Sequence, residues 1–183
     1  MRRGFWMVWT GAFVLIGMCM HYPDGPPPAH TGGFGEPTCQ ACHFDSPLDV
    51  PGGWLAVEGV PEVYRAGQSY RLTIQLTKPA MASSGFQLAA RFADGTQAGV
   101  LEAVDDRVEV IQDDSSAVLY AQHTVAGTNL TAPDTARWML TWTPPPGDTA
   151  AVLFHATANA ANNDASAFGD FIYTVHVQSK HLP

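Results

Sequence analysis

Two cysteines and a histidine near the N-terminal end form the most chemically specific pattern in the chain. They occur as Cys39-Gln40-Ala41-Cys42-His43, which is the Cys-x-x-Cys-His spacing of a c-type haem attachment site. Two thiols at this separation can each bond one vinyl group of the macrocycle, and the imidazole that follows can coordinate the iron. The composition of the chain predicts about 0.002 chance occurrences of this pattern. We therefore predict one haem c, bonded through Cys39 and Cys42, with His43 as the proximal iron ligand.

The same residues are open to two other interpretations. In an oxidising compartment Cys39 and Cys42 could form a small disulfide, with His43 as a bystander. They could also supply two ligands of a zinc site. A closed structural zinc site prefers four protein ligands, however, and no second cysteine pair follows in the sequence.

A second axial ligand for the iron would come from a histidine or a methionine elsewhere in the chain. The candidates are His30, His123, His155, His176, His181, Met81 and Met139. His123 lies near the end of an expected strand, where an imidazole can point away from a sheet, although a hydrogen-bonded rim residue fits the same position. His155 falls inside an apolar strand and fits packing. A ligand at His30 would cost more ordering entropy, because this residue lies in an expected tether.

From Trp54 onward the sequence consists of short runs with period-two alternation, separated by turn signals. The clearest run places Tyr70, Leu72, Ile74 and Leu76 on one face of a strand and polar residues on the other. The further expected strands are 54–57, 85–92, 98–103, 108–111, 118–124, 138–143, 151–158 and 171–177. No stretch predicts a helix of three turns. Eight or nine short strands predict an all-β, antiparallel sandwich.

The N-terminal part predicts export. Arg2 and Arg3 precede the uncharged apolar run Phe5–Met20, which has the length of a signal-peptide core, although an uncleaved membrane anchor fits as well. We expect four parts: a signal peptide or anchor over 1–20, a Pro/Gly-rich tether over 21–37, a haem-attachment segment over 38–53, and a sandwich over 54–178. The expected location is the periplasm, the membrane-anchored envelope or the cell surface.

The charge balance limits the kinds of partner. The chain has 9 basic and 17 acidic side chains, for a formal net charge of −8. Such a surface repels phosphate backbones, so nucleic acid is not an expected partner. It favours a redox partner with a basic docking surface. The Asn/Asp-rich stretch 159–170 could bind calcium, but its spacing does not match the twelve-residue calcium loop and such clusters are ordinary turn material.

Several sequence blocks resemble the Reeler-type β-sandwich domain, in the bacterial form called choice-of-anchor V. The blocks are Gly85–Leu88, Gln97–Gly99, His123-Thr124 with Gly127-Thr128, Trp138 with Leu140–Pro145, and Phe154–Thr174. Upstream, the Gly-rich stretch Thr31–Glu36 before Thr38-Cys39 also resembles the bacterial members, which have a Cys-x-x-Cys pair there. The likeness spans about residues 31 to 178.

This resemblance implies an Ig-like sandwich that is exported to the envelope, and it implies no single activity, because a sandwich is a scaffold. The family has a histidine-threonine pair at the position of His123-Thr124, which favours His123 as the distal iron ligand. Two positions depart from the family: His155 replaces another aromatic residue, and Ala158 replaces a glycine.

These observations predict an exported monohaem c-type protein that carries electrons and is not an enzyme. The alternative is a non-catalytic structural or adhesive cell-surface module with a Cys39–Cys42 disulfide. A haem-based sensor, or a domain that works beside larger membrane redox enzymes, is a third interpretation.

Overall fold

The computed structural model describes residues 22–147 and 150–182. The expected signal peptide or anchor over 1–20 lies outside these residues. The described chain forms ten strands and two short 3-10 helices. In chain order they are η1 (Cys39–Ala41), β1 (Trp54–Glu58), β2 (Val63–Tyr64), β3 (Tyr70–Thr77), β4 (Ser83–Phe92), β5 (Val100–Ala103), β6 (Val108–Gln112), β7 (Leu119–His123), η2 (Ala126–Thr128), β8 (Thr135–Thr143), β9 (Val152–Ala161) and β10 (Phe171–His181).

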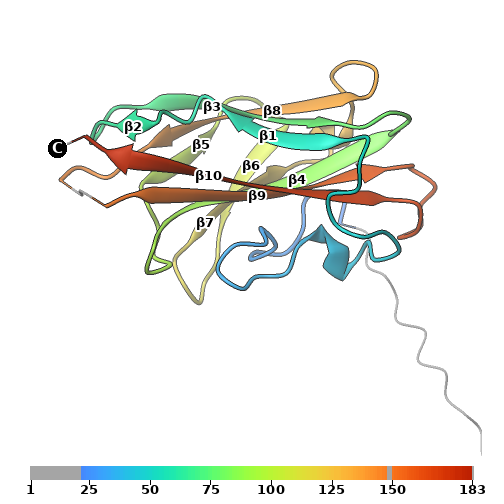
Figure 1. Ribbon diagram of the computed structural model, residues 1–183, viewed down its shortest axis with the longest axis horizontal. Helices are drawn as coiled ribbons and strands as arrows, with labels where there is room; N and C mark the ends of the chain where they lie inside the picture. Colours follow the sequence, from blue (N-terminus) through green and yellow to red (C-terminus); the bar gives the residue numbers. More distant parts are fainter. Residues whose placement is uncertain (1–21, 148–149, 183) are drawn as a thin grey trace, which may run out of the picture.

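The strands form two sheets that pack face to face (Figure 1). The four-stranded sheet has the order β1-β3-β8-β5, and the six-stranded sheet has the order β2-β10-β9-β4-β7-β6. All neighbouring strands pair antiparallel except β2, which pairs parallel to β10 through two residues. The expected all-β sandwich is confirmed.

The core lies between the two sheets and follows the predicted alternation. In β3 the side chains of Leu72, Ile74 and Leu76 are buried, while those between them are only partly covered. The largest buried side chains include two tryptophans whose indole N–H groups are satisfied by backbone carbonyls. Trp138 donates to Gly127 at 2.9 Å, and Trp142 donates to Ala98 at 2.8 Å. Burying these rings therefore leaves no indole donor without a partner.

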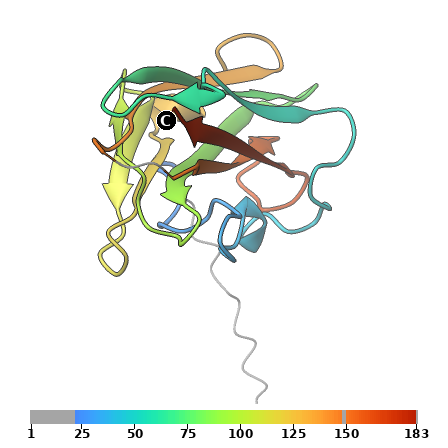
Figure 2. The same ribbon diagram turned by 60° about the vertical axis from the view of Figure 1, so that its left-hand side comes forward.

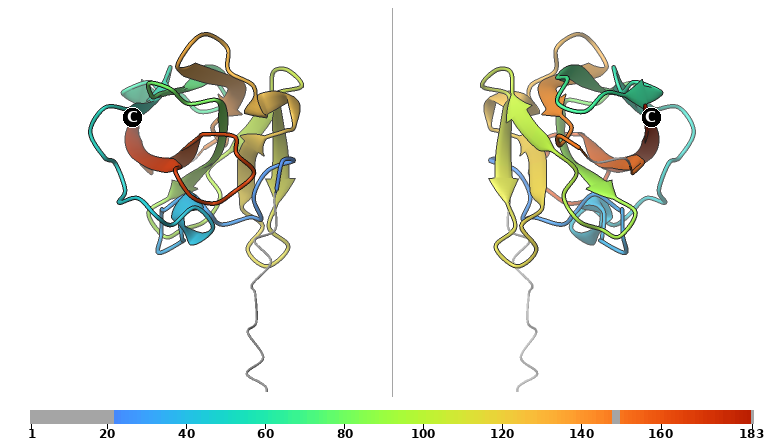
Figure 3. Two further views of the ribbon diagram at one scale, coloured as in Figure 1. Left: turned by 90° about the vertical axis from the view of Figure 1, so that its right-hand side faces the viewer. Right: turned by 90° about the vertical axis from the view of Figure 1, so that its left-hand side faces the viewer.

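The outer face of the six-stranded sheet is covered as well. Strand β4 is buried at eight consecutive positions, and β9 at five, which is the pattern of strands packed on both faces. The cover is the segment before β1, drawn in blue, which runs beneath β9 and β4 in each view (Figures 1 to 3). The sequence predicts a tether over 21–37; in the structure, residues 22–37 lie against the sheet.

Buried polar side chains fasten this segment to the sheet. Gln87, which is fully buried, accepts a hydrogen bond from His30 N at 2.6 Å and donates to Pro27 O at 3.0 Å. Further along, Arg91 forms an ion pair with Glu36, and the Tyr120 hydroxyl donates to the same carboxylate at 2.7 Å. The segment is thus fastened to the sheet by hydrogen bonds and an ion pair.

The remaining sequence expectations agree with the fold in outline. The nine expected strands all occur, whereas the two-residue strand β2 was not expected and β8 begins three residues earlier than predicted. Within residues 22–147 and 150–182, no helix has the length and hydropathy needed to cross a membrane.

Candidate functional site

A cleft of about 250 Å³ lies at one end of the six-stranded sheet, where it meets the covering segment. Its lining comes from the ends of three neighbouring strands, β4, β7 and β9, from η2, from the β9–β10 loop and from the segment before β1. The predicted site residues Cys39, Cys42, His43 and His123 all line this cleft, and so does His30. The structure therefore brings the attachment motif and two candidate second ligands to one place.

The attachment motif is shaped by a single 3-10 turn. Thr38 caps the turn, because its hydroxyl accepts a hydrogen bond from Gln40 N at 3.1 Å. The backbone N–H groups of Cys42 and His43 then both donate to the carbonyl of Cys39. In a 3-10 helix side chains three residues apart eclipse one another, so Cys39 and Cys42 lie on the same side of the turn. Both cysteines also line the same cleft, as attachment to one ligand requires.

The imidazole of His43 is held by a buried carboxylate. Its Nδ1 lies 2.6 Å from Oδ2 of Asp170, a residue that is 1% exposed. A carboxylate can only accept hydrogen bonds, so Nδ1 carries the proton and Nε2 keeps its lone pair. Metal-binding histidines usually donate their second ring N–H to such a partner, which fixes the tautomer and raises the basicity of the ligating nitrogen. His43 thus has the hydrogen-bonding arrangement that is typical of a metal-binding histidine.

Asp170 is itself oriented by two further donors. Asn162 N donates to its Oδ1 at 3.0 Å, and Asn159 Nδ2 lies 3.2 Å from its Oδ2. The Asn159 amide nitrogen also lies 3.2 Å from His43 Nδ1. The carbonyl oxygen of Asn159 is buried without a hydrogen-bond partner in the described structure, and Asn159 lines the cleft. The Asn159 carbonyl is therefore an acceptor that is open to a donor in the cleft.

The pKa of the Cys39 thiol lies well above the ordinary value for cysteine. Cys39 is a free thiol, and burial raises its pKa to about 11. The thiolate is the reactive form of cysteine, so at neutral pH this side chain is an inert thiol in the folded domain.

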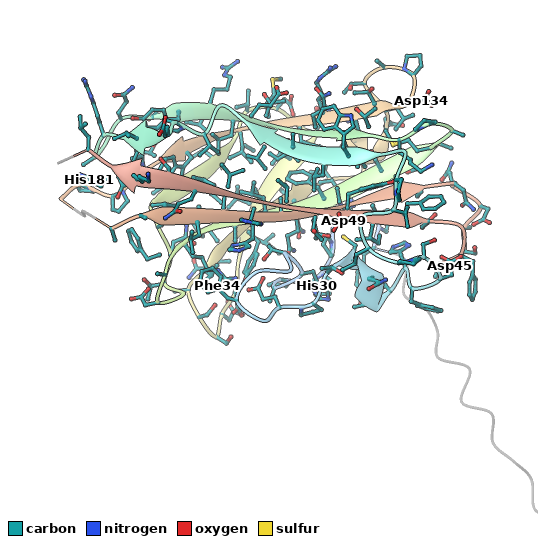
Figure 4. The ribbon with its side chains drawn as sticks, viewed as in Figure 1. His30, Phe34, Asp45, Asp49, Asp134 and His181 are labelled. Atoms are coloured by element: carbon teal, nitrogen blue, oxygen red, sulfur yellow. The ribbon has the colours of Figure 1, made fainter. Side chains whose placement is uncertain are left out.

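The residues after His43 return to the sheet through two aspartates, labelled in Figure 4. Asp45 accepts a hydrogen bond from Gly169 N at 2.7 Å, which ties the motif to the loop between β9 and β10. Asp49 accepts from the backbone and the hydroxyl of Thr174 at 2.7 and 2.8 Å. These contacts fix the segment after the motif to the β9–β10 loop, which carries Asp170, and to β10.

His123 lies at the end of β7 with its ring against β4. Phe86 N donates to His123 Nδ1 at 3.0 Å, and Phe86 O lies 3.2 Å from the same nitrogen. The ring occupies the space beside Gly85, where a Cβ atom would come within 2.5 Å of it. Burial lowers the pKa of His123, so the ring is neutral at pH 7. The sequence allows His123 to be either an iron ligand or a hydrogen-bonded rim residue. In the structure it lines the cleft and also forms hydrogen bonds at the end of its strand.

The other candidate ligands lie away from the cleft lining. His155 and His176 face each other across β9 and β10, with ring centroids 6.2 Å apart, and His155 also contacts Phe34. His181 packs against Tyr64, and Met81 belongs to the core. Met139 lies in β8, in the sheet that does not contribute to the cleft.

The Asn/Asp-rich loop serves the site by its contacts with other residues. Asp170 binds His43, and Asp164 accepts hydrogen bonds from Asn162 Nδ2 and Ser166 N. Across the part of the chain that the structure describes, no three His, Cys, Asp or Glu side chains are grouped as a metal-ion site.

Sequence reasoning missed Asp170 and Asn159 as partners of His43. Asp170 is 127 residues away from the histidine in sequence, so no local spacing points to the contact. The available signal was the Phe154–Thr174 block, which contains both residues.

Comparisons with known proteins agree with the architecture. No protein-family model matches the chain, and no curated protein matches its sequence. Among solved structures, the chain resembles the reelin-N domain of F-spondin, with 21% identity and a TM-score of 0.50 over 79% of this chain and 96% of that one. It also resembles fragment 1 of the human F-spondin reeler domain, with 21% identity and a TM-score of 0.46 over 74% of this chain and 92% of that one. At this identity the likeness concerns the fold alone, and it supports a reeler-type β-sandwich.

Proposed function

We propose that this chain carries one covalently attached haem c in the cleft, bonded through Cys39 and Cys42 and coordinated by His43. The observation that carries the proposal is the His43–Asp170 contact at 2.6 Å. It leaves the Nε2 lone pair available on an imidazole that lines the same cleft as both cysteines.

The chemistry of the cleft supports this ligand. Small-molecule sites enclose roughly 300–1,000 Å³. The cleft, at about 250 Å³, is smaller than this range, so part of a macrocycle held there would extend to the surface. The residues supply two thiols for bonding and an oriented imidazole. Within residues 22–147 and 150–182, His30 and His123 are the histidines that line the cleft besides His43, so they are the candidates for a second protein ligand of the iron.

The function that follows is electron transfer in the cell envelope, and we propose a carrier more than a catalyst. Bound haem would supply one-electron chemistry at iron. The chain would hold the group, set its potential through His43 and Asp170, and leave an edge near the surface for a partner. With a net charge of −8, the chain favours a partner with a basic docking surface.

The proposal is tested by expressing the full chain together with haem-attachment machinery. We expect intact mass spectrometry to show the added mass of one haem, and a pyridine haemochrome spectrum to show thioether-bonded haem. The Cys39→Ser/Cys42→Ser double variant, matured in the same way, is the control and should carry none. A wild-type chain without added mass would reject the proposal.

A second candidate is a non-catalytic structural or cell-surface module in which Cys39 and Cys42 form a disulfide. The comparisons favour this candidate, because the shared fold is that of reeler domains and nothing in them points to electron transfer. It predicts a mass lower than that of the reduced chain by two hydrogen atoms, no haem, and unchanged folding of the sandwich in the cysteine double variant.

A further inference from the structure

The tautomers of the histidines that line the cleft differ, and this difference decides which of them can bind iron. An imidazole coordinates a metal through a nitrogen that carries a lone pair, so the other nitrogen has to bear the proton when the ring is neutral. Among the residues that the structure describes, three histidines line the cleft: His30, His43 and His123. For each of them the hydrogen-bond partners of Nδ1 show where the proton lies.

His123 has the wrong tautomer for coordination through Nε2. The shorter of its two Nδ1 contacts, at 3.0 Å, is with Phe86 N, and a backbone N–H can only donate. Phe86 O, which can only accept, lies further away, at 3.2 Å. The shorter contact favours a lone pair on Nδ1 and the proton of the neutral ring on Nε2. The backbone of Tyr22 also forms a hydrogen bond with the ring. Binding iron through Nε2 would require the proton to move to Nδ1, facing the N–H of Phe86.

His30 has the opposite arrangement. Its Nδ1 lies 3.0 Å from the carbonyl oxygen of Pro27 and 3.0 Å from that of Pro28. Carbonyl oxygens only accept, so Nδ1 carries the proton and the lone pair lies on Nε2. This is the state that Asp170 imposes on His43. Of the three histidines, His30 and His43 thus both donate from Nδ1 to an oxygen atom.

The loop that carries His30 is also held in place before any ligand binds. Gln87 bonds to His30 N at 2.6 Å and to Pro27 O at 3.0 Å from a fully buried position on β4. Three consecutive prolines, 26–28, fix φ at three positions and reduce the conformational freedom of the unfolded segment. The ordering entropy that argues against a ligand in a flexible tether is therefore small here. Figure 4 shows His30 beneath the six-stranded sheet.

We propose that Nε2 of His30 is the second axial ligand of the iron, while His123 forms part of the wall of the cleft. This inference rests on the proposed function, because it concerns the haem that Cys39, Cys42 and His43 would hold. Gln87 is then a positioning residue for His30.

The test compares the His30→Ala and His123→Ala variants of the full chain, matured with haem. The wild-type protein should be low-spin and should not bind carbon monoxide when reduced. His30→Ala should lose the low-spin spectrum and gain carbon monoxide binding in the reduced form, whereas His123→Ala should remain low-spin. An unchanged low-spin spectrum in His30→Ala, a high-spin spectrum in His123→Ala, or a wild type that is already high-spin would overturn the assignment.

A second measurement needs no haem. Nitrogen-15 NMR of the folded, haem-free chain should show the Nδ1-protonated tautomer for His30 and His43, and the Nε2-protonated tautomer for His123. The reverse assignment for His30 and His123 would overturn the inference even if haem attaches. A wild-type chain that gains no haem mass would instead reject the proposed function, so the two failures are distinguishable.

Discussion

At the scale of single residues, the buried carboxylate of Asp170 is the main influence of the chain on His43. A carboxylate that accepts the Nδ1 proton makes the imidazole a stronger donor and places a negative charge near the metal. Both effects would stabilise the oxidised state of an iron bound to His43. The Asp170→Asn variant should therefore raise the reduction potential, by roughly 60–120 mV if the loss of this partner changes the equilibrium 10- to 100-fold.

Spectroelectrochemical titration of the haem-loaded protein would measure this shift. Asp164→Asn is the matched control, because Asp164 lines the same cleft but bonds to Asn162 and Ser166. A shift of the same size in both variants would show that charge alone, and not the bond to His43, sets the potential.

The pKa of about 11 for the Cys39 thiol predicts slow alkylation of the haem-free domain. The ordinary pKa of a cysteine thiol is about 9.0, so at neutral pH the thiolate fraction in the folded chain is about 100-fold below that in the unfolded chain. In a Cys42→Ser variant, the rate of Cys39 modification by iodoacetamide should rise with pH and level off only near pH 11. The urea-unfolded variant is the control and should level off near pH 9. A folded-state plateau near pH 9 would contradict the assigned burial.

At the scale of elements, the segment over 22–37 is the part on which the site depends most. Glu36 fixes it through Arg91 and Tyr120, and the ion pair is well buried, with side-chain exposures of 10% for Glu36 and 7% for Arg91. Removing one partner of a buried pair leaves an uncompensated charge. The Glu36→Gln variant should therefore lower the free energy of unfolding by about 3 kcal/mol. Hydrogen exchange at Gly33 and His30 should accelerate as the segment loosens.

The effect of Glu36→Gln should depend on pH. Burial alone would raise the pKa of Glu36, but its hydrogen bonds with Thr31, Tyr120 and Arg91 and the arginine charge outweigh this, so the pKa lies below 4.5. A carboxyl with a depressed folded-state pKa stabilises the fold above its unfolded pKa, and this contribution is lost as the pH falls through the folded value. The difference between wild type and variant should thus be largest above about pH 4.5 and shrink in acid. The exposed Glu58→Gln variant is the control and should show no such difference in urea titrations.

The sequence predicts the elements whose signals are local. Strand β3 shows clear alternation because one of its faces is buried and the other is not, and the cysteine spacing encodes the turn at η1. Strand β2 has two residues and follows no pattern. The cover on the outer face was not predictable, because the buried polar residues Gln87 and Arg91 have partners more than fifty residues away. A polar residue in a strand looks exposed until such a partner is known.

The same distinction holds for the site. Cys39, Cys42 and His43 could be identified from spacing alone, and His123 from its place at a strand end. Asp170 and Gln87 act through contacts between distant parts of the chain. The tautomers of His30 and His123 depend on which backbone groups face Nδ1, and no sequence pattern contains that information.

At the scale of the whole molecule, charge controls the approach of a partner. The chain has a net charge of −8, and none of the described residues that line the cleft is a lysine or an arginine. Asp45, two residues after the motif, and Asp164, on the β9–β10 loop, are both exposed. The edge of a macrocycle in this cleft would thus lie in a negative field, which attracts cations and repels anions.

The reduced haem-loaded protein should therefore be oxidised faster by a small cationic complex than by an anionic complex of similar potential. We expect a difference of about tenfold at low ionic strength. The two rates should converge between about 0.01 and 0.15 M salt, as the screening length falls from about 30 to about 8 Å. An Asp45→Asn/Asp164→Asn double variant should reduce the difference, and Glu102→Gln on β5, in the other sheet, should leave it unchanged. Stopped-flow oxidation measures all of these rates. If the anionic oxidant were equally fast at low salt, the surface around the cleft would not select its partner by charge, and the expectation of a basic docking surface would fail with it.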